Sequence, residues 1–145
     1  MKKPAKQILF SCTLNAIRSV MAEGFFNRIA PEGWHAGSCG VIAGPADGFT
    51  FAVMEEEGIA LDVNRQSKLF TDYNVDEIDY AVSLSVEAQF HLVSWVMDIP
   101  HEHWKVKEPF SADENREAQL VHYRLIRDEI STRVGELVTR ITDNT

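Results

Sequence analysis

The stretch ILFSCTLNAIRSVMAEGFF, residues 8–26, gives the clearest indication of the fold of this chain. It opens with a short apolar run that does not alternate with polar residues, which is typical of a strand covered on both faces. From Ser19 onward the apolar residues recur at helical spacing until Pro31, which cannot continue a helix. The stretch therefore predicts a strand over residues 7–11, a loop that starts at Cys12, and a helix from Ser19.

The rest of the chain repeats this alternation of strand and helix. Residues 86–97 also fit a strand, but apolar residues at helical spacing favour a helix there. The elements expected after the first helix are strands over 34–38, 77–85 and 101–106, and helices over 47–57, 86–97 and 112–140. Strands that alternate with helices predict an α/β fold: a doubly wound four-stranded parallel sheet with helices on both faces and a central 77–85 strand. In such sheets ligands bind beyond the carboxyl ends of the strands, where Cys12 lies.

Length and composition bound the class of protein. The 145 residues predict one domain, 1–145, and 45% apolar with 25% charged residues indicates a globular chain. A net charge of −8 argues against a general nucleic-acid binder, and no apolar run approaches the roughly 20 residues of a membrane span. Two cysteines, Cys12 and Cys39, make no disulfide framework, so the cytoplasm is the expected compartment.

The loop after Cys12 has the features of an anion-binding turn. Backbone N–H groups between a strand and a helix N-terminus form a concavity suited to an anion, and the same place favours the thiolate form of a cysteine. Arg18 can hold two oxygens of a tetrahedral oxyanion with its planar fork, and Ser19 can donate its hydroxyl to the thiolate. This layout suits in-line attack on a phosphate ester with a phosphocysteine intermediate. The alternative is that Cys12 is a packed small residue and Arg18 is solvated.

The octapeptide CTLNAIRS, residues 12–19, resembles the active-site loop of the low-molecular-weight protein tyrosine phosphatases: cysteine, five residues, arginine, serine. Other segments resemble parts of that family in the same order, so that the resemblance runs from residue 7 to about residue 135. These segments are RSVMAEGFF, HAGSCG, MEEEGIALDVNRQSKLF, IDYAVSLS and HWKVKEPF. The resemblance implies a phosphomonoester hydrolase, a protein tyrosine phosphatase, that needs no cofactor.

The resemblance also implies a role for each residue of the loop. Cys12 would be the nucleophile, Arg18 the phosphate clamp, and Ser19 the donor that stabilises the thiolate. Asn15 would brace the loop through its side chain. The residues expected to surround the phosphate are Thr13, Leu14, Asn15, Ala16, Ile17 and Arg18.

Two regions depart from the family pattern. The family places Asp before the proline of the loop that carries the general acid, whereas this chain has Glu108 before Pro109. Glu108 is the predicted general acid, with an ordinary loop glutamate as the alternative, because one more methylene displaces the carboxyl group. Where phosphotyrosine enzymes line the substrate cleft with aromatic residues, this chain offers Val41, Ile42 and Phe110.

Two alternatives stand beside the phosphatase. Arsenate reductases of the thioredoxin-coupled type share this fold and loop, but they relay oxidation through further cysteines after the third strand, and residues 85–100 contain none. Cys39 is expected to be a packed residue rather than a redox partner. The other alternative is a phosphate-binding module with weak turnover.

The expected partners follow from the loop and from the charge. They are a phosphorylated protein or small aryl phosphate, and inorganic phosphate or a similar oxyanion, with neither nucleic acid nor membrane. His101 and His103 supply only two nitrogens, so no metal site is expected.

Overall fold

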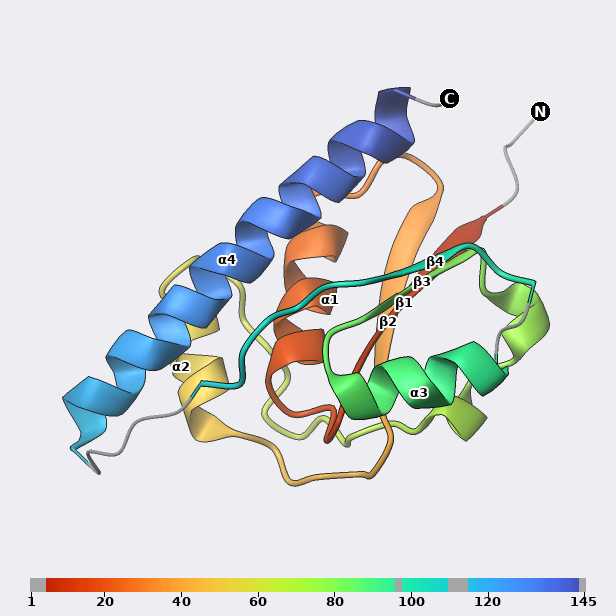
Figure 1. Cartoon of the computed structure of the whole chain (residues 1–145). Helices are drawn as coiled ribbons and strands as arrows, with labels where there is room; N and C mark the ends of the chain where they lie inside the picture. The colour runs from red at the N-terminus through yellow and green to blue at the C-terminus, as the bar shows by residue number, and fades with distance from the viewer. Residues whose placement is uncertain (1–4, 96–97, 110–114, 144–145) are drawn as a thin grey trace.

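The computed structural model describes residues 5–95, 98–109 and 115–143, which build one parallel sheet between layers of helices (Figure 1). The strands are β1 (Lys6–Cys12), β2 (Trp34–Gly40), β3 (Tyr80–Ser83) and β4 (His101–His103). Their order is β2-β1-β3-β4 and every neighbouring pair is parallel. The predicted doubly wound four-stranded α/β sheet is therefore confirmed.

The strand limits differ from the expected ones in places that the pairing explains. β2 continues past residue 38 to Gly40, because β1 pairs with it as far as Cys12. β3 is internal, as expected, but it begins only at Tyr80, since Val75–Glu77 forms a 3-10 turn. β4 stops short of residue 106 because its only partner strand among the described residues, β3, ends at Ser83.

Four helices cover the sheet, on both faces as predicted. They are α1 (Arg18–Ile29), α2 (Gly48–Glu55), α3 (Val86–Trp95) and α4 (Arg116–Asp143). Helices α1 and α4 pack on one face and α3 lies on the other (Figure 1). Residues 86–95 are thus helical, and the strand alternative for this segment is wrong.

The first strand shows why its sequence does not alternate. Ile8, Phe10 and Cys12 lie in the larger hydrophobic core, against α1 and α4, whereas Leu9 lies in the smaller core on the opposite face. Both faces of β1 are covered, so that both sets of side chains must be apolar or small. The Phe10 ring lies 5.8 Å from that of Trp104, which belongs to the segment after β4.

The long helix α4 begins at Arg116 rather than at residue 112. The Asn115 side chain accepts a hydrogen bond from the Glu117 N–H at 2.8 Å, which is the usual contact of a helix N-cap. Residues 112–114, where the sequence predicted the first turn, lie outside the described residues. None of the helices in the described part of the chain, α4 included, is long and apolar enough to cross a membrane.

Candidate functional site

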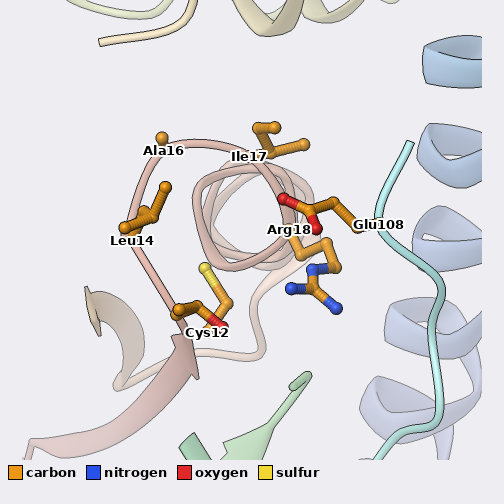
Figure 2. Close-up of a pocket in the computed structure, with 7 residues that line it drawn as sticks. Cys12, Leu14, Ala16, Ile17, Arg18 and Glu108 are labelled. Carbon is orange, nitrogen blue, oxygen red and sulfur yellow. The ribbon is translucent and has the colours of Figure 1, made fainter. Parts of the chain in front are cut away.

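A pocket opens where β1 ends and α1 begins, at the carboxyl edge of the sheet. The sequence predicts an anion site at this place. The loop of residues 12–18 forms most of the wall, and Glu108 reaches it from the segment after β4 (Figure 2). The residues that line the pocket are Cys12, Thr13, Leu14, Ala16, Ile17, Arg18 and Glu108. The structure thus brings together the predicted nucleophile, phosphate clamp and general acid.

Cys12 is the last residue of β1, and its side chain is 2% exposed. Its Sγ lies 3.0 Å from Oγ of Ser19, which is fully buried in the first turn of α1. The Ser19 Oγ already accepts a hydrogen bond from Nδ2 of Asn15 at 2.9 Å. The hydroxyl hydrogen of Ser19 can therefore point to the sulfur, which is the arrangement that stabilises a thiolate.

Asn15 holds the loop in its unusual shape. Its φ of 53° lies in the left-handed region, which asparagine tolerates better than most residues. The Lys68 N–H, which can only donate, bonds to Oδ1 of Asn15 at 2.8 Å and so identifies the amide oxygen. The amide nitrogen then donates to Ser19 and to Oγ of Ser38, each at 2.9 Å. Asn15 thereby ties the loop to α1, β2 and the segment before Phe70 at once.

Neighbouring backbone also fixes the loop from outside. The Val41 N–H bonds to the Thr13 carbonyl at 2.9 Å, and the Gly44 N–H bonds to the Leu14 carbonyl at 3.0 Å. A Cβ at Gly40 would lie 2.7 Å from the Asn15 backbone nitrogen, closer than real Cβ atoms approach. The end of β2 must therefore be glycine for the loop to lie against it.

Arg18 is held in place by backbone carbonyls. Its Nη1 donates to the carbonyl oxygen of Leu84 at 2.9 Å and to that of Val106 at 3.0 Å. Nε and Nη2 make no hydrogen bond to another described residue, and these donors form the edge of the guanidinium that suits two oxyanion oxygens. The clamp is thus positioned by the segments after β3 and β4.

Glu108 is exposed, and it makes no hydrogen bond or ion pair with any other described residue. Figure 2 shows its carboxylate directed toward the space between Ile17 and Arg18. The Glu108 carboxyl group thus lines the same pocket as the Cys12 sulfur, although the two residues are far apart in the sequence.

The predicted cleft residues lie in different surroundings. Val41 packs against the smaller core, and neither it nor Ile42 lines the pocket. The Ile42 side chain is 59% exposed on the surface beside the loop. Phe110 lies outside the described residues. The wall that the described residues do supply is aliphatic, from Leu14, Ala16 and Ile17.

Cys39 is fully buried on the other face of the sheet, in the core that contains Leu9. Cys12 lies in the larger core, so the two thiols point to opposite sides of the sheet. Burial above all, with smaller contributions from Cys12 and Asp72, raises the pKa of the Cys39 thiol. Cys39 therefore stays a neutral packed thiol.

The two histidines of β4 do not face a common site. Nδ1 of His101 contacts the carbonyl of Ile99 at 2.9 Å, and Nδ1 of His103 contacts Oγ of Ser83 at 2.7 Å. Burial, with the positive charge of Arg18 added to it, holds the pKa of His103 below its usual value. Within the described ranges no group of three or more His, Cys, Asp or Glu side chains could hold a metal ion.

Several contributors to the site were missed by sequence reasoning. The Leu84 and Val106 carbonyls hold Arg18, and backbone carbonyls leave no residue-type signal. The Thr13 hydroxyl donates a hydrogen bond to the Glu87 carboxylate at 3.0 Å. The pKa of this carboxyl is lowered mainly by a hydrogen bond from the backbone N–H of Glu87 and, to a smaller extent, by the one from Thr13. Ser38 is fully buried in β2 and accepts a hydrogen bond from Asn15, but its residue type alone does not place it at the site.

Comparison with known proteins agrees with this geometry. The sequence profile of the family described as low molecular weight phosphotyrosine protein phosphatase matches residues 7–145. An arsenate reductase of Bacillus subtilis (strain 168) is 30% identical over 132 residues, which are 90% of this chain and 94% of that protein. A solved arsenate reductase in its reduced state is 30% identical, with a TM-score of 0.74 over 94% of this chain and 98% of its own.

A solved phosphatase shares the fold to the same degree. The low molecular weight protein tyrosine phosphatase from T. tengcongensis is 25% identical, with a TM-score of 0.76 over 94% of this chain and 99% of its own. The relatives thus include both phosphatases and arsenate reductases. With nearly the whole length matched and the loop of residues 12–18 formed around Cys12, this chain belongs to the low molecular weight phosphotyrosine protein phosphatase family.

Proposed function

We propose that this chain is a phosphomonoester hydrolase that acts on phosphotyrosine or a similar aryl phosphate through a phosphocysteine at Cys12. The observation that carries the proposal is the Cys12 sulfur, 3.0 Å from the Ser19 hydroxyl, in a pocket that Arg18 and Glu108 also line. The T. tengcongensis relative is a protein tyrosine phosphatase, which supports the aryl class of substrate.

In the first step the Cys12 thiolate attacks phosphorus opposite the ester oxygen. A sulfur–phosphorus bond forms while the bond from phosphorus to the aryl oxygen breaks. The free donors of Arg18 and the loop N–H groups hold the three remaining oxygens, and fixed donors of this kind stabilise charge without reorganising. Glu108, in its protonated form, gives its proton to the leaving aryl oxygen.

In the second step water releases the phosphate. The Glu108 carboxylate takes a proton from a water molecule, whose oxygen attacks phosphorus as the sulfur–phosphorus bond breaks. Ser19 donates a hydrogen bond to the departing sulfur and keeps its proton, so that Cys12 leaves as a thiolate. The products are inorganic phosphate and the starting enzyme, with no oxidant or reductant consumed.

The two cysteines of the chain provide a matched test. The reduced protein should hydrolyse p-nitrophenyl phosphate between about pH 5 and 7, with vanadate as a competitive inhibitor. Cys12→Ser should lower kcat by roughly a thousandfold or more, because a serine hydroxyl without a base is a poor nucleophile. Cys39→Ser, which changes only a packed thiol, should keep kcat within about twofold.

Two results would contradict the proposal. Hydrolysis that survives Cys12→Ser would remove Cys12 as the nucleophile. A parent protein that binds phosphate tightly but turns over no aryl phosphate would support a phosphate-binding module instead.

Arsenate reduction is the second candidate, because relatives such as the Bacillus subtilis protein are named arsenate reductases. Cys12 would form a sulfur–arsenic(V) adduct, and a thiol would then attack the Cys12 sulfur, releasing arsenic(III) and leaving a disulfide. Cys39 is buried on the opposite face of the sheet, and the chain contains no third cysteine. The attacking thiol must therefore come from another molecule, a small thiol or a dithiol protein.

An assay of arsenite release separates the two activities. The parent protein is incubated with arsenate and either glutathione or a thioredoxin system, beside the aryl phosphatase assay. We expect phosphatase turnover to exceed arsenate turnover by at least about a hundredfold. Arsenate turnover that is faster than phosphate ester hydrolysis, and that Cys12→Ser abolishes, would reverse this assignment.

A further inference from the structure

The helix α3 carries an apolar stripe that no other described part of the chain covers. Val86, Phe90 and Val93 are 58%, 77% and 54% exposed. Their spacing of four and three residues places them on one face of the helix. The opposite face is also apolar, with Ala88 and Leu92 buried. A surface helix normally turns a polar face to water, so this α3 stripe is an exposed feature that needs an explanation.

The stripe begins at the mouth of the candidate active site. Glu87, the neighbour of Val86, accepts the hydrogen bond from Thr13 of the loop. The carbonyl of Leu84, just before α3, holds Arg18. From this point α3 runs along the outer side of the sheet (Figure 1). Anything bound along the stripe would therefore continue directly from a phosphate held in the loop.

The far end of α3 is negatively charged. A hollow there is lined by Trp95 and Ile99 together with two carboxylates, Asp76 and Asp98. The carbonyl end of a helix adds partial negative charge at the same place. The helix itself contains no lysine or arginine that could neutralise these groups.

We propose that the α3 stripe and the acidic hollow bind the polypeptide that flanks the phosphorylated residue, and that this flanking segment is apolar and then basic. The proposal rests on the proposed function and names its substrate class more closely. Val86 and Val93 are about 10 Å apart along the helix axis, which equals roughly three extended residues. The hollow lies about 15 Å from the mouth of the candidate site, which is the length of α3. The basic residue of the bound segment, a lysine or an arginine, would therefore lie roughly four or five residues from the phosphorylated residue.

Charge argues for this occupant over a second copy of the chain. Each copy has a net charge of −8, and two copies joined along α3 would bring their Glu87, Asp76 and Asp98 groups together. Like charges that face each other across an interface oppose association. A basic segment instead gains from the same carboxylates.

The test uses two phosphotyrosine peptides of equal length. One has apolar residues next to phosphotyrosine and arginine four and five residues away; the other has serine and glutamate at those positions. The parent should show a kcat/KM about tenfold higher for the first peptide. The double variant Phe90→Ser/Val93→Ser should remove that preference, while its kcat/KM for p-nitrophenyl phosphate stays within about twofold of the parent.

The matched control is Val121→Ser/Leu125→Ser on α4, whose side chains are 50% and 62% exposed and lie four residues apart, on one face of the helix. This variant should keep the peptide preference. Asp76→Asn/Asp98→Asn should reduce the preference by about two- to fivefold, and added salt should do the same to the parent. Circular dichroism confirms that each variant is folded.

Three outcomes would overturn the inference. The parent could have the same kcat/KM for both peptides, or the control variant could lose the preference as fully as the α3 variant. Sedimentation could also show that the parent is a dimer and that the α3 variant alone is a monomer. A parent that fails to hydrolyse p-nitrophenyl phosphate contradicts the proposed function instead. The inference is then decided by fluorescence anisotropy, in which the first peptide must bind the parent more tightly than it binds the α3 variant.

Discussion

The 12–18 loop and the segment that carries Glu108 face each other across one pocket, but they are held very differently. Asn15 alone makes three side-chain hydrogen bonds to buried or backbone groups, and Arg18 is held by two carbonyls. Glu108 is exposed and contacts no other described residue through a hydrogen bond. In the proposed reaction the phosphate would therefore enter a loop that hydrogen bonds already fix, whereas the leaving group would meet an exposed side chain.

The largest effect is expected from a substitution of Arg18, which belongs to the hydrogen-bonded 12–18 loop. Arg18→Lys keeps the positive charge but loses the planar guanidinium group, so that the side chain cannot hold both carbonyls and two phosphate oxygens. We expect kcat/KM for p-nitrophenyl phosphate to fall by about 10²- to 10³-fold. Arg133→Lys, an exposed substitution on α4, is the control and should change nothing measurable. An Arg18→Lys enzyme within tenfold of the parent would mean that charge alone suffices.

The next effect separates the two contributions of Asn15 to the loop. Asn15→Ala loses three hydrogen bonds and leaves buried partners unsatisfied, so the free energy of unfolding should fall by about 2–4 kcal/mol. Asn15→Gly loses the same bonds but adopts the φ of 53° without strain. In urea denaturation it should therefore be about 1 kcal/mol more stable than Asn15→Ala. Equal stabilities would show that the left-handed backbone costs nothing here.

A smaller effect on kcat, which depends on the substrate, is expected from a substitution of Glu108. Glu108→Gln removes the proton that the aryl oxygen needs, and this matters most when the leaving group is a weak acid. The variant should lose about 10²-fold in kcat on phenyl phosphate but less than about tenfold on p-nitrophenyl phosphate. The same loss on both substrates would assign Glu108 to binding rather than to proton transfer.

The smallest effect is expected outside the site, at the exposed carboxyl group of Glu56. Glu56 bonds to Arg124 and Arg127 on α4, and the Arg124 hydrogen bonds above all lower its pKa from 4.5 to about 2. Because this carboxyl is exposed to solvent, Glu56→Gln should cost only about 0.5–1 kcal/mol of unfolding free energy at pH 6. The lowered pKa means that the contribution is present above pH 4.5 and is lost as pH falls toward 2.

Urea denaturation of parent and Glu56→Gln at several pH values follows this difference. The two curves should converge between about pH 4 and 2. A gap that persists below pH 2, or one as large as that of Asn15→Ala, would contradict the small contribution that we expect from this exposed carboxyl group.

The sequence predicted most of the site residues that lie close together in the chain, within residues 12–19. Cys12, Arg18 and Ser19 stand at fixed offsets across one strand-to-helix turn, so their spacing alone places them together. The acceptors of Arg18 could not be predicted, because Leu84 and Val106 contribute carbonyls from distant segments whose residue types carry no signal. The parallel direction of the strands was likewise predictable from their alternation with helices, but the ends of the strands were not.

The placement of Val41 shows the same limit. An apolar residue after a strand can face either side of a sheet, and packing against the smaller core decided the matter. The start of α4 differs for a local reason, since the Asn115 side chain caps the Glu117 N–H and the helix begins after Asn115. At Val41, by contrast, tertiary packing selects between options that the sequence leaves equal.

The position of Cys39 has a consequence for oxidative stress. With its two thiols on opposite faces of the sheet, the folded chain has no internal disulfide that could trap a sulfenic acid formed at Cys12. Unless a thiol of another molecule reaches the sulfenic acid first, further peroxide oxidises Cys12 to the sulfinic acid, which ordinary thiols do not reverse. Recovery of this protein depends on how quickly thiols of other molecules reach the pocket.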